Sequence, residues 1–485
     1  MTGPRLLSEL AARSGLAADP VISGVTADSR QVKPGTLFAA LPGSKSDGRD
    51  FIPAAIAAGA AAILAPEDTP DQAAPVVRSP DVRREYALAA ARFWDAQPAV
   101  VVAVTGTNGK TSVATFCRQI FTLLGRKAAS MGTLGVQAGD EAITPPGLTT
   151  PDAAEVARLA SVLAKRGVTH LAMEASSHGI DQRRLDGIVL TAAGFTNLSQ
   201  DHLDYHADMD AYRAAKLRLF EALLPRGRTA VLNADAGDFS AFAAGAAASG
   251  HVLLSVGEHG HGLKLVDREP TAAGQRLTVE AAGRRHVVGL PLAGAFQADN
   301  ALVAAGLCIA AGEETGAVLA ALERLEGAPG RLQRVGSAPR GGEAYVDYAH
   351  TPDGLRAVLA ALRPHAAGRL IVVFGAGGDR DRAKRPLMGA AAAELADLAI
   401  VTDDNPRTED PAAIRRAVLD GAPGALEVAD RRAAIRAGVE QLRDGDILVV
   451  AGKGHEQGQI VGAEIHPFDD MTETAAALAW EPAHV

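Results

Sequence analysis

Cysteine and long hydrophobic runs are scarce in this sequence. Its 485 residues include two cysteines, Cys117 and Cys308, and each lies in an apolar, helix-like context. We therefore expect two buried free thiols and a reducing compartment, the cytoplasm. An uncharged Ala/Gly-rich run at 54–66 is too short to span a bilayer, and we expect it to be a packing helix of small residues. The first 15 residues lack the apolar segment of a signal peptide.

Positive charge is also in short supply. Lys and Arg number 48 against 57 Asp and Glu, which gives a formal net charge of -9. This balance argues against a nucleic-acid-binding protein, which usually has a basic face, although a local basic pocket for an anion remains compatible with it. Hydrophobic residues make up 47% of the chain, which is enough for several cores. The length predicts about three domains.

Two joints that contain Pro and Gly, 95–100 and 326–333, divide the chain into expected domains at 1–98, 99–330 and 331–485. We predict an α/β fold with a small mixed N-terminal domain, a central P-loop-type parallel sheet and a C-terminal Rossmann-like domain. In the last two, continuous apolar runs alternate with amphipathic patterns, which indicates parallel sheets covered on both faces. The expected strands are 100–104, 169–173, 188–195, 229–232, 343–348, 369–374, 398–402 and 446–451, and the expected helices of the central domain are 111–124, 152–166 and 208–224.

The stretch 105-TGTNGKTS-112 follows an apolar strand and opens a helix. A glycine-rich turn in this position directs several backbone N–H groups at one anion, and the helix N-terminus adds partial positive charge. Lys110 then reaches the β and γ phosphates of a nucleotide, and Thr111 or Ser112 binds Mg²⁺. The general phosphate-loop pattern has an earlier glycine where this chain has Val104, so the motif is a short form. We expect a nucleotide-binding loop rather than a mere tight turn, made of Gly106, Thr107, Asn108, Gly109, Lys110, Thr111 and Ser112.

Polar residues that follow this loop suggest a metal site. Glu174 ends an apolar strand, where it is expected either to bind Mg²⁺ or to cap a helix. The segment 197–206 contains a metal-like set of acidic residues and histidines, and a polar loop with capping aspartates is the preferred alternative for two of them, Asp204 and His206. The remaining members of the set are Asp201 and His202. Lys216, on a predicted helix, reads from its context alone as a surface lysine.

The TGTNGKTS loop is similar to the short loop of the Mur ligases and folylpolyglutamate synthetases, and the resemblance extends over nearly the whole chain. It implies three domains that bind UDP, ATP and an incoming amino acid in that order. It also implies that Lys110, Lys216 and His202 are catalytic, with Lys216 carbamylated. The carbamate would supply a hard oxygen ligand. The implied Mg²⁺ ligands are Thr111, Glu174, His202 and the carbamate of Lys216.

The resemblance also implies substrate-binding residues. For the first substrate, UDP-N-acetylmuramoyl-L-alanyl-D-glutamate, these are Ala27, Ser29, Ser44, Lys45, Ser46, Thr149, Thr150, Ser176, Gln182 and Arg184. Without the family, turns in a β-rich module would explain the N-terminal members equally well. For ATP, the implied residues beyond the loop are Asn300, Arg331 and Asp347. Asn300 is also compatible with a helix N-cap, and Arg331 with a salt bridge at a domain joint.

The segment 403-DDNPRTED-410 follows the apolar strand 398–402. On its own it reads as a turn, because Asn-Pro commonly starts one, and Arg407 reads as a solvated charge. In the family, the DNPR motif implies the branch that adds meso-diaminopimelate rather than lysine, since an arginine can pair with the second carboxylate. The implied diaminopimelate-binding residues are Arg380, Asp404, Asn405, Pro406, Arg407, Gly452 and Glu456.

The activity that the resemblance implies is amide-bond formation driven by ATP. The γ-phosphoryl group moves to the glutamate γ-carboxylate, and the amine of the amino acid then displaces phosphate from the acyl phosphate. A nucleophilic Ser or Cys dyad is not obvious in the sequence, which fits direct transfer. ATP and Mg²⁺ are the expected cofactors, and a monomer without nucleic-acid partner or membrane insertion is expected. The alternatives are an ATP-hydrolysing switch or motor, a sibling ligase and a non-enzymatic binding protein.

Overall fold

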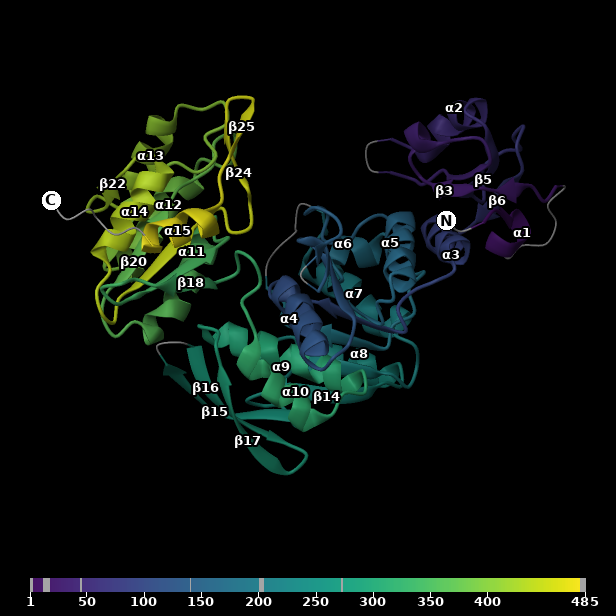
Figure 1. Ribbon diagram of the computed structural model, residues 1–485. Coiled ribbons are helices and arrows are strands. Elements are labelled where there is room, and N and C mark those ends of the chain that lie inside the picture. The colour runs from purple at the N-terminus through teal and green to yellow at the C-terminus, as the bar shows by residue number, and fades with distance from the viewer. Residues whose placement is uncertain are drawn as a thin grey trace. The chain divides into compact units, whose positions relative to one another are not determined.

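The computed structural model describes residues 3–11, 18–43, 46–139, 141–199, 205–271 and 274–479 (Figure 1). The chain forms two compact units. The first contains Met1–Gly262 and Val303–Val318, and the second contains Leu263–Leu302 and Leu319–Val485. Among the described residues, no helix is both long and apolar enough to cross a membrane.

The first unit begins with a four-stranded parallel sheet in the order β3-β4-β5-β6. Helix α3 (Val82–Trp94) packs on one face of this sheet and α2 (Ile52–Ala57) on the other. The strands are β3 (Gly24–Thr26), β4 (Thr36–Ala39), β5 (Ala60–Pro66) and β6 (Val76–Ser79). The shorter elements are β1 (Arg5–Leu6), α1 (Leu7–Leu10), β2 (Val21–Ile22), η1 (Ser29–Gln31) and η2 (Gly48–Phe51).

The prediction of one helix over 54–66 is wrong. Helix α2 ends at Ala57, and β5 occupies Ala60–Pro66 at the centre of the sheet. Gly59 has φ +94°, a left-handed conformation that glycine adopts without strain and that ends the helix. The side chains of β5 pack into cores on both faces of the sheet, which explains a strand without polar alternation.

The larger sheet of the first unit runs in the order β10-β9-β8-β11-β7-β12-β13-β14, with parallel pairing from β8 to β14. Helices α5 and α8 pack on one face of it. Its strands are β7 (Val100–Thr105), β8 (Ala128–Gly132), β9 (Gly135–Ala138), β10 (Glu141–Ala142), β11 (His170–Glu174), β12 (Ala192–Phe195), β13 (Thr229–Asn233) and β14 (Val252–Gly257). Its helices are α4 (Lys110–Leu123), α5 (Ala153–Lys165), α6 (Ser177–Asp181), α7 (Met209–Arg218), the π-helical turn η3 (Leu219–Leu223) and α8 (Phe239–Ala248).

Two predicted elements of this region are shorter than expected. The strand predicted at 188–195 begins only at Ala192, because the backbone of Val189 hydrogen-bonds the side chain of Gln97 instead of a neighbouring strand. The helix predicted at 208–224 is α-helical to Arg218 and then becomes the π-helical turn. The other predicted strands and helices of the region lie within about two residues of the observed ones, as is usual for element ends.

The second unit contains an antiparallel meander and a doubly wound sheet. The meander consists of β15 (Leu263–Thr271), β16 (Gly274–Ala281) and β17 (Arg284–Leu290). The sheet has the order β18-β19-β23-β20-β21-β22 and is parallel except for the edge strand β18. Its strands are β18 (Gln333–Ser337), β19 (Glu343–Asp347), β20 (Leu370–Phe374), β21 (Leu398–Val401), β22 (Leu426–Glu427) and β23 (Ile447–Ala451).

Helices cover both faces of this second sheet. Helices α11 (Pro352–Leu362), α12 (Lys384–Leu395) and α13 (Pro411–Leu419) contribute to one core, and α14 (Arg431–Gln441) and α15 (Asp470–Ala479) contribute to the other. The remaining elements are α9 (Ala295–Ala310), α10 (Thr315–Ala321), η4 (Leu322–Arg324), η5 (Arg363–His365) and the hairpin of β24 (Gly458–Val461) and β25 (Glu464–Pro467). The predicted α/β class with parallel sheets is thereby confirmed. In such sheets, ligands bind at the carboxyl ends of the strands.

Candidate active site

The predicted nucleotide-binding loop connects β7 to the first residue of α4, at the centre of its sheet. Gly106 has φ +152°, and a Cβ atom added to it would lie 1.9 Å from Thr196 Oγ1. Gly109 has φ +86° and forms the N-cap of α4. Only glycine fits the first position, and the second favours it strongly. The loop therefore has the close backbone turn and the helix N-terminus that anion binding requires.

Two lysine side chains converge on the carbonyl oxygen of Gly106. Lys110 Nζ donates to it over 2.9 Å and also to the Thr107 oxygen over 2.7 Å. Lys216 Nζ donates to the same Gly106 oxygen over 2.7 Å. The expectation of a surface lysine at 216 is wrong, because the residue is 1% exposed and its ammonium lies 4.4 Å from the ring centre of Tyr212. Lys110 is half-buried, whereas the buried Lys216 cation is costly unless anionic or polar groups surround it, and a polyphosphate is such a group.

Glu174 lies beside the loop at the end of β11 and is 3% exposed. Its Oε2 accepts a hydrogen bond from Thr111 Oγ1 over 2.9 Å, and its Oε1 accepts one from Thr133 N over 2.8 Å. The alternative role of Glu174 as a helix cap is wrong, since Ser176 caps α6. A hydroxyl and a carboxylate side by side are the hard oxygen donors that Mg²⁺ prefers, so these residues fit the ion. The described residues contain no cluster of three or more His, Cys, Asp or Glu that would hold a metal ion by itself.

Several predicted residues lie outside the described part of the chain: Ser44, Lys45, Asp201, His202 and Asp204. His206 is described and buried, with its ring centre 5.2 Å from that of Tyr212. The N-cap of α7 is Asp208, whose side chain accepts from Ala211 N. Capping by an aspartate thus occurs next to this segment, two residues after His206.

The residues predicted for the dipeptide part of the first substrate form one hydrogen-bonded network. Arg184 donates to the Thr150 oxygen over 2.6 Å and to Gln182 Oε1 over 2.7 Å. Ser176 Oγ lies 3.1 Å from Thr150 Oγ1. Burial lowers the pKa of the Arg184 guanidinium. Because arginine has an ordinary pKa above 12, the group keeps its charge and can pair with a carboxylate or phosphate.

Thr133 connects this network to the nucleotide loop, and the sequence analysis missed it. Its hydroxyl lies 3.0 Å from Thr149 Oγ1 and 3.3 Å from Glu174 Oε2. Hydrogen bonds therefore run from Thr111 through Glu174 and Thr133 to Thr149. The signal that would have revealed Thr133 is its place directly after the parallel strand β8.

The predicted uridine-binding residues lie beyond β3 and β4. Ala27 follows the end of β3, and Ser29 begins the short helix η1, which is capped by Asp28. Ser46 is exposed, and its carbonyl oxygen accepts from Gly43 N over 3.1 Å. These positions lie beyond the carboxyl ends of parallel strands, as expected for ligand binding.

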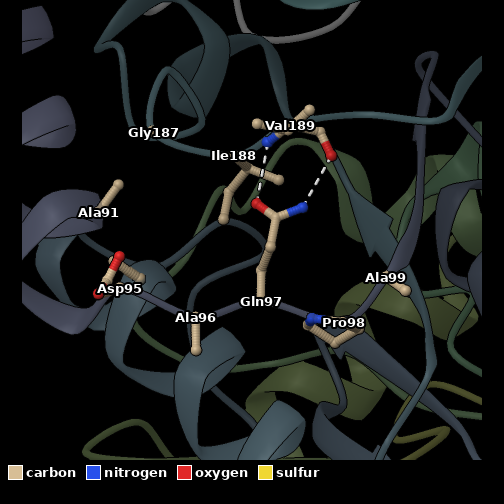
Figure 2. A pocket seen from close by; sticks show the side chains of 10 residues that line it. Ala91, Asp95, Ala96, Gln97, Pro98, Ala99, Gly187, Ile188 and Val189 are labelled. Atoms are coloured by element: carbon tan, nitrogen blue, oxygen red, sulfur yellow. Dashed lines mark hydrogen bonds between the residues drawn. The ribbon is translucent and has the colours of Figure 1, made fainter. Parts of the chain in front are cut away.

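A cavity of about 390 Å³ lies elsewhere in the first unit, at the joint predicted from 95–100 (Figure 2). The side-chain amide of Gln97 bonds both to Val189 N over 3.0 Å and to the Val189 oxygen over 2.9 Å. None of the residues that line this cavity is among those predicted for the site. The lining residues are Ala91, Asp95, Ala96, Gln97, Pro98, Ala99, Ala157, Gly187, Ile188 and Val189.

The further residues predicted for ATP lie in the second unit and are connected to one another. Asn300 Nδ2 donates to Gln297 Oε1 over 3.3 Å, and Gln297 Nε2 donates to the Arg331 oxygen over 3.0 Å. The Arg331 guanidinium lies 4.9 Å from the ring centre of Tyr348. Asn300 lies inside α9, so its alternative role as an N-cap is wrong.

Asp347 is the third of these residues and ends β19. Its carboxylate accepts from Leu332 N over 2.6 Å and from Ala349 N over 2.8 Å. Burial raises its pKa to about 6, although the Arg331 charge and the two backbone N–H groups favour the ionised form. Asp347 thus fixes the backbone directly after Arg331 and two residues after its own position.

The DNPR segment lies directly after β21, beside the turn that follows β23. Asn405 Nδ2 donates to Glu456 Oε2 over 2.9 Å, and a Cβ atom on Gly452 would lie 2.5 Å from Asp404 Oδ2. Four of the residues predicted for diaminopimelate are therefore neighbours, while Arg380 is exposed with its Nη1 3.5 Å from the Asp379 oxygen.

Arg407 has an unusual backbone for a residue other than glycine, with φ +50°. Its amide donates to the Ile460 oxygen over 3.0 Å, and its oxygen accepts from Gly462 N over 2.7 Å. Its side chain is half-buried, and Nη1 donates to the Gly378 oxygen over 2.8 Å. The hairpin of β24 and β25 thus holds Arg407 in one conformation.

Models of protein families match most of the chain. The Mur ligase family, catalytic domain, matches residues 21–92; the Mur ligase middle domain matches 104–308; and the Mur ligase, glutamate ligase domain, matches 330–454.

Two curated relatives carry the name UDP-N-acetylmuramoyl-L-alanyl-D-glutamate–2,6-diaminopimelate ligase. The one from Caulobacter vibrioides is 70% identical over 468 residues, which is 95% of this chain and 96% of the relative. The one from Bradyrhizobium diazoefficiens is 55% identical over 463 residues, 94% of this chain and 95% of the relative.

Solved structures agree with these relatives. A structure of a UDP-N-acetylmuramoyl-L-alanyl-D-glutamate–2,6-diaminopimelate ligase is 35% identical, with a TM-score of 0.77 and coverage of 98% of this chain and 99% of that chain. A Mycobacterium tuberculosis folylpolyglutamate synthase complexed with ADP and AMPPCP has 21% identity and a TM-score of 0.60 over 80% of this chain and 92% of that chain, and it shares the fold. On this evidence the chain belongs to the Mur ligase family.

Proposed function

We propose that this chain is an ATP-dependent ligase that joins meso-diaminopimelate to UDP-N-acetylmuramoyl-L-alanyl-D-glutamate and forms ADP and phosphate. The observation that carries the proposal is the pairing of a DNPR loop with Glu456 at one sheet edge, in a chain 70% identical to a relative named for this reaction. The product is a precursor of peptidoglycan. Two buried free cysteines fit a reducing compartment, and we propose the cytoplasm.

The reaction needs an activated carboxylate, because a free carboxylate would have to expel oxide. The γ-phosphoryl group of ATP moves to the glutamate γ-carboxylate and gives an acyl phosphate. Lys110 neutralises charge on the transferred group from the nucleotide-binding loop, where its ammonium donates to the Gly106 oxygen. The amine of diaminopimelate then attacks the acyl carbon, and phosphate leaves from the tetrahedral intermediate.

Thr111 and Glu174 are the described residues that would hold Mg²⁺, which neutralises phosphate charge when bound. We propose a carbamate on Lys216 as a further oxygen ligand. Support comes from its burial and its position at the loop, because a carbamate would replace a buried cation by an anion next to Lys110. His202 is proposed as a ligand on the family resemblance alone.

The amino acid is proposed to bind at the edge formed by the DNPR loop and the 452–456 turn. Arg407 would bind the distal carboxylate with parallel hydrogen bonds. Asp404 and Glu456 offer negative charge for the distal ammonium. Arg380 is proposed to take the second carboxylate, because Gly377 brings the Arg380 and Arg407 side chains close together: a Cβ atom on it would lie 3.8 Å from Arg380 Cγ and 2.9 Å from Arg407 Nη1. Lysine lacks the distal carboxylate and would leave Arg407 without an anionic partner.

The test is ADP formation measured with the UDP-dipeptide against a panel of amino acids. We expect ADP only when both the dipeptide and meso-diaminopimelate are present. ADP formation that ignores the amino acid would favour a hydrolytic switch, and a preference for a different amino acid would favour a sibling ligase.

A further inference from the structure

Lys453 is a fully buried lysine that none of the roles above uses. It is 0% exposed, and its ammonium donates to Asn405 Oδ1 over 2.7 Å and to the Gly458 oxygen over 2.8 Å. It therefore connects the turn after β23 to the DNPR loop and to the first residue of β24. Burial lowers the pKa of the Lys453 ammonium, and the neighbouring Asp404 charge opposes that shift.

The chemistry of the three groups fixes the orientation of the Asn405 amide. An ammonium group only donates hydrogen bonds, so Lys453 requires the oxygen of Asn405 to face it. Ile460 N donates to the same oxygen over 2.9 Å. The NH₂ group of Asn405 must then point the other way, where the Glu456 carboxylate, which only accepts, lies 2.9 Å away.

This arrangement controls one oxygen of Glu456. Asn405 holds Oε2, and in the proposed ligase Oε1 is then the oxygen that accepts from the incoming ammonium group. The hairpin that supplies Ile460 N also holds the backbone of Arg407. The same buried contacts therefore position both groups proposed to bind the distal end of the amino acid, the Glu456 carboxylate and the Arg407 guanidinium.

Resting on the proposed function, we propose that Lys453 is a positioning residue for amino-acid selection, which acts through Asn405 to orient Glu456. It touches no substrate. Its loss would weaken the binding of diaminopimelate and leave phosphoryl transfer at the nucleotide-binding loop unchanged.

The experiment measures KM for all three substrates and kcat in Lys453→Met, which keeps an unbranched buried side chain and removes the donor. Losing a hydrogen bond that orients a charged group predicts a rise of about tenfold or more in KM for diaminopimelate. The KM values for ATP and the UDP-dipeptide, and kcat, stay within about twofold on the same reasoning. The matched control is Arg369→Met, which removes a charged partner of Asp446 at the amino ends of the central strands β20 and β23. It should lower thermal stability and leave the three KM values unchanged.

A double-mutant cycle tests the path through Glu456. If Lys453 acts through it, Lys453→Met and Glu456→Gln combined raise the diaminopimelate KM no more than the worse single variant. Should Lys453→Met fail to fold, Lys453→Gln keeps a side-chain donor for Asn405 Oδ1 but removes the ammonium group, and it must show a smaller rise that is again confined to the KM for diaminopimelate.

Unchanged KM for diaminopimelate, an equal rise in all three KM values, or multiplicative effects in the double variant would each overturn the inference. A normal KM in Glu456→Gln beside a raised one in Lys453→Met would overturn it too, since Glu456 would not be the route. Absence of ligation by the unmodified chain would instead overturn the proposed function, and the inference with it.

Discussion

At the residue scale, the most informative contact is the shared Gly106 oxygen, to which Lys110 and Lys216 both donate. An oxygen that accepts from two ammonium groups marks where the chain concentrates positive charge. In the proposed ligase, Lys110 acts on the transferred phosphate from there, and Lys216 offers oxygen atoms to Mg²⁺ as a carbamate. Two predictions about the proposed ligase follow from this geometry.

Replacing Lys110 by alanine removes a charge that acts on the transferred phosphoryl group. We expect kcat to fall by ~10²-fold or more, which is typical for the loss of one such group. Binding of the UDP-dipeptide, measured by calorimetry, should persist because its proposed residues are separate. Near-normal turnover in Lys110→Ala would exclude the phosphate role of this loop.

Replacing Lys216 by alanine tests the proposed carbamate. The variant should be nearly inactive, and short carboxylic acids should partly restore ADP formation by filling the vacated anion site. Lys110→Ala is the control, because there an added carboxylate has no missing anion to replace. An active Lys216→Ala enzyme, or rescue of both variants alike, would count against a carbamate.

Arg407→Ala tests the proposal that Arg407 binds the distal carboxylate of diaminopimelate. Hydrogen bonds to a charged group contribute about 1.5–3 kcal/mol, so preference for diaminopimelate over lysine should fall by about 10-fold to 100-fold. The loss is expected in kcat/KM for diaminopimelate, with little change for lysine. If the variant keeps its full preference for diaminopimelate over lysine, another residue must bind the distal carboxylate.

At the element scale, local patterns predicted the central strands of the two larger sheets to within about two residues, except for the start of β12, but they missed a central strand of the N-terminal sheet. Strand 100–104 and the helix after it follow from valines, glycines and a lysine within one stretch. The strand at 60–66 could not be predicted in this way, because a run of alanines is compatible with a helix and with a buried strand. Its conformation depends on the two cores into which its side chains pack. The burial of Lys216 was likewise invisible, because it depends on the loop and on Tyr212 from the same helix.

The contact of η5 with the meander of β15–β17 makes folding stability depend on pH. His365 Nε2 accepts from Gly294 N over 3.0 Å, so Nδ1 carries the proton and faces the Thr271 oxygen at 3.1 Å. Burial lowers the pKa of His365. The unfolded chain, with an ordinary histidine pKa of about 6.5, then binds more protons than the folded chain below that pH.

The contribution of His365 is therefore present above about pH 6.5 and is lost as pH falls through its lowered folded pKa, by up to ~1.4 kcal/mol per pH unit in that window. Glutamine in His365→Gln can still accept from Gly294 N but does not titrate. We therefore expect the unfolding temperature of this variant, measured by calorimetry, to fall less than that of wild type between pH 7.5 and pH 5. His466→Gln, at an exposed histidine of β25, is the control and should follow wild type. Identical pH profiles for His365→Gln and wild type would contradict this origin of the effect.

At the scale of the whole molecule, the α/β class and its parallel sheets were predictable from alternating apolar runs and amphipathic helices. The three matched family segments lie in the same order as the predicted UDP-, ATP- and amino-acid-binding parts. Long-range partners were not predictable from spacing. Thr133 joins two predicted sites through a hydroxyl contact, and Lys453 orders a loop 48 residues earlier in the sequence.

The central claim is that one chain couples ATP cleavage to selection of a particular amino acid. The most direct measurement gives the purified chain ATP, Mg²⁺, the UDP-dipeptide and an equimolar mixture of meso-diaminopimelate and lysine, and identifies the products by mass. We predict one UDP-tripeptide, the diaminopimelate adduct, formed in equal amount to ADP. ADP without a tripeptide, or a lysine adduct in comparable amount, would contradict the claim.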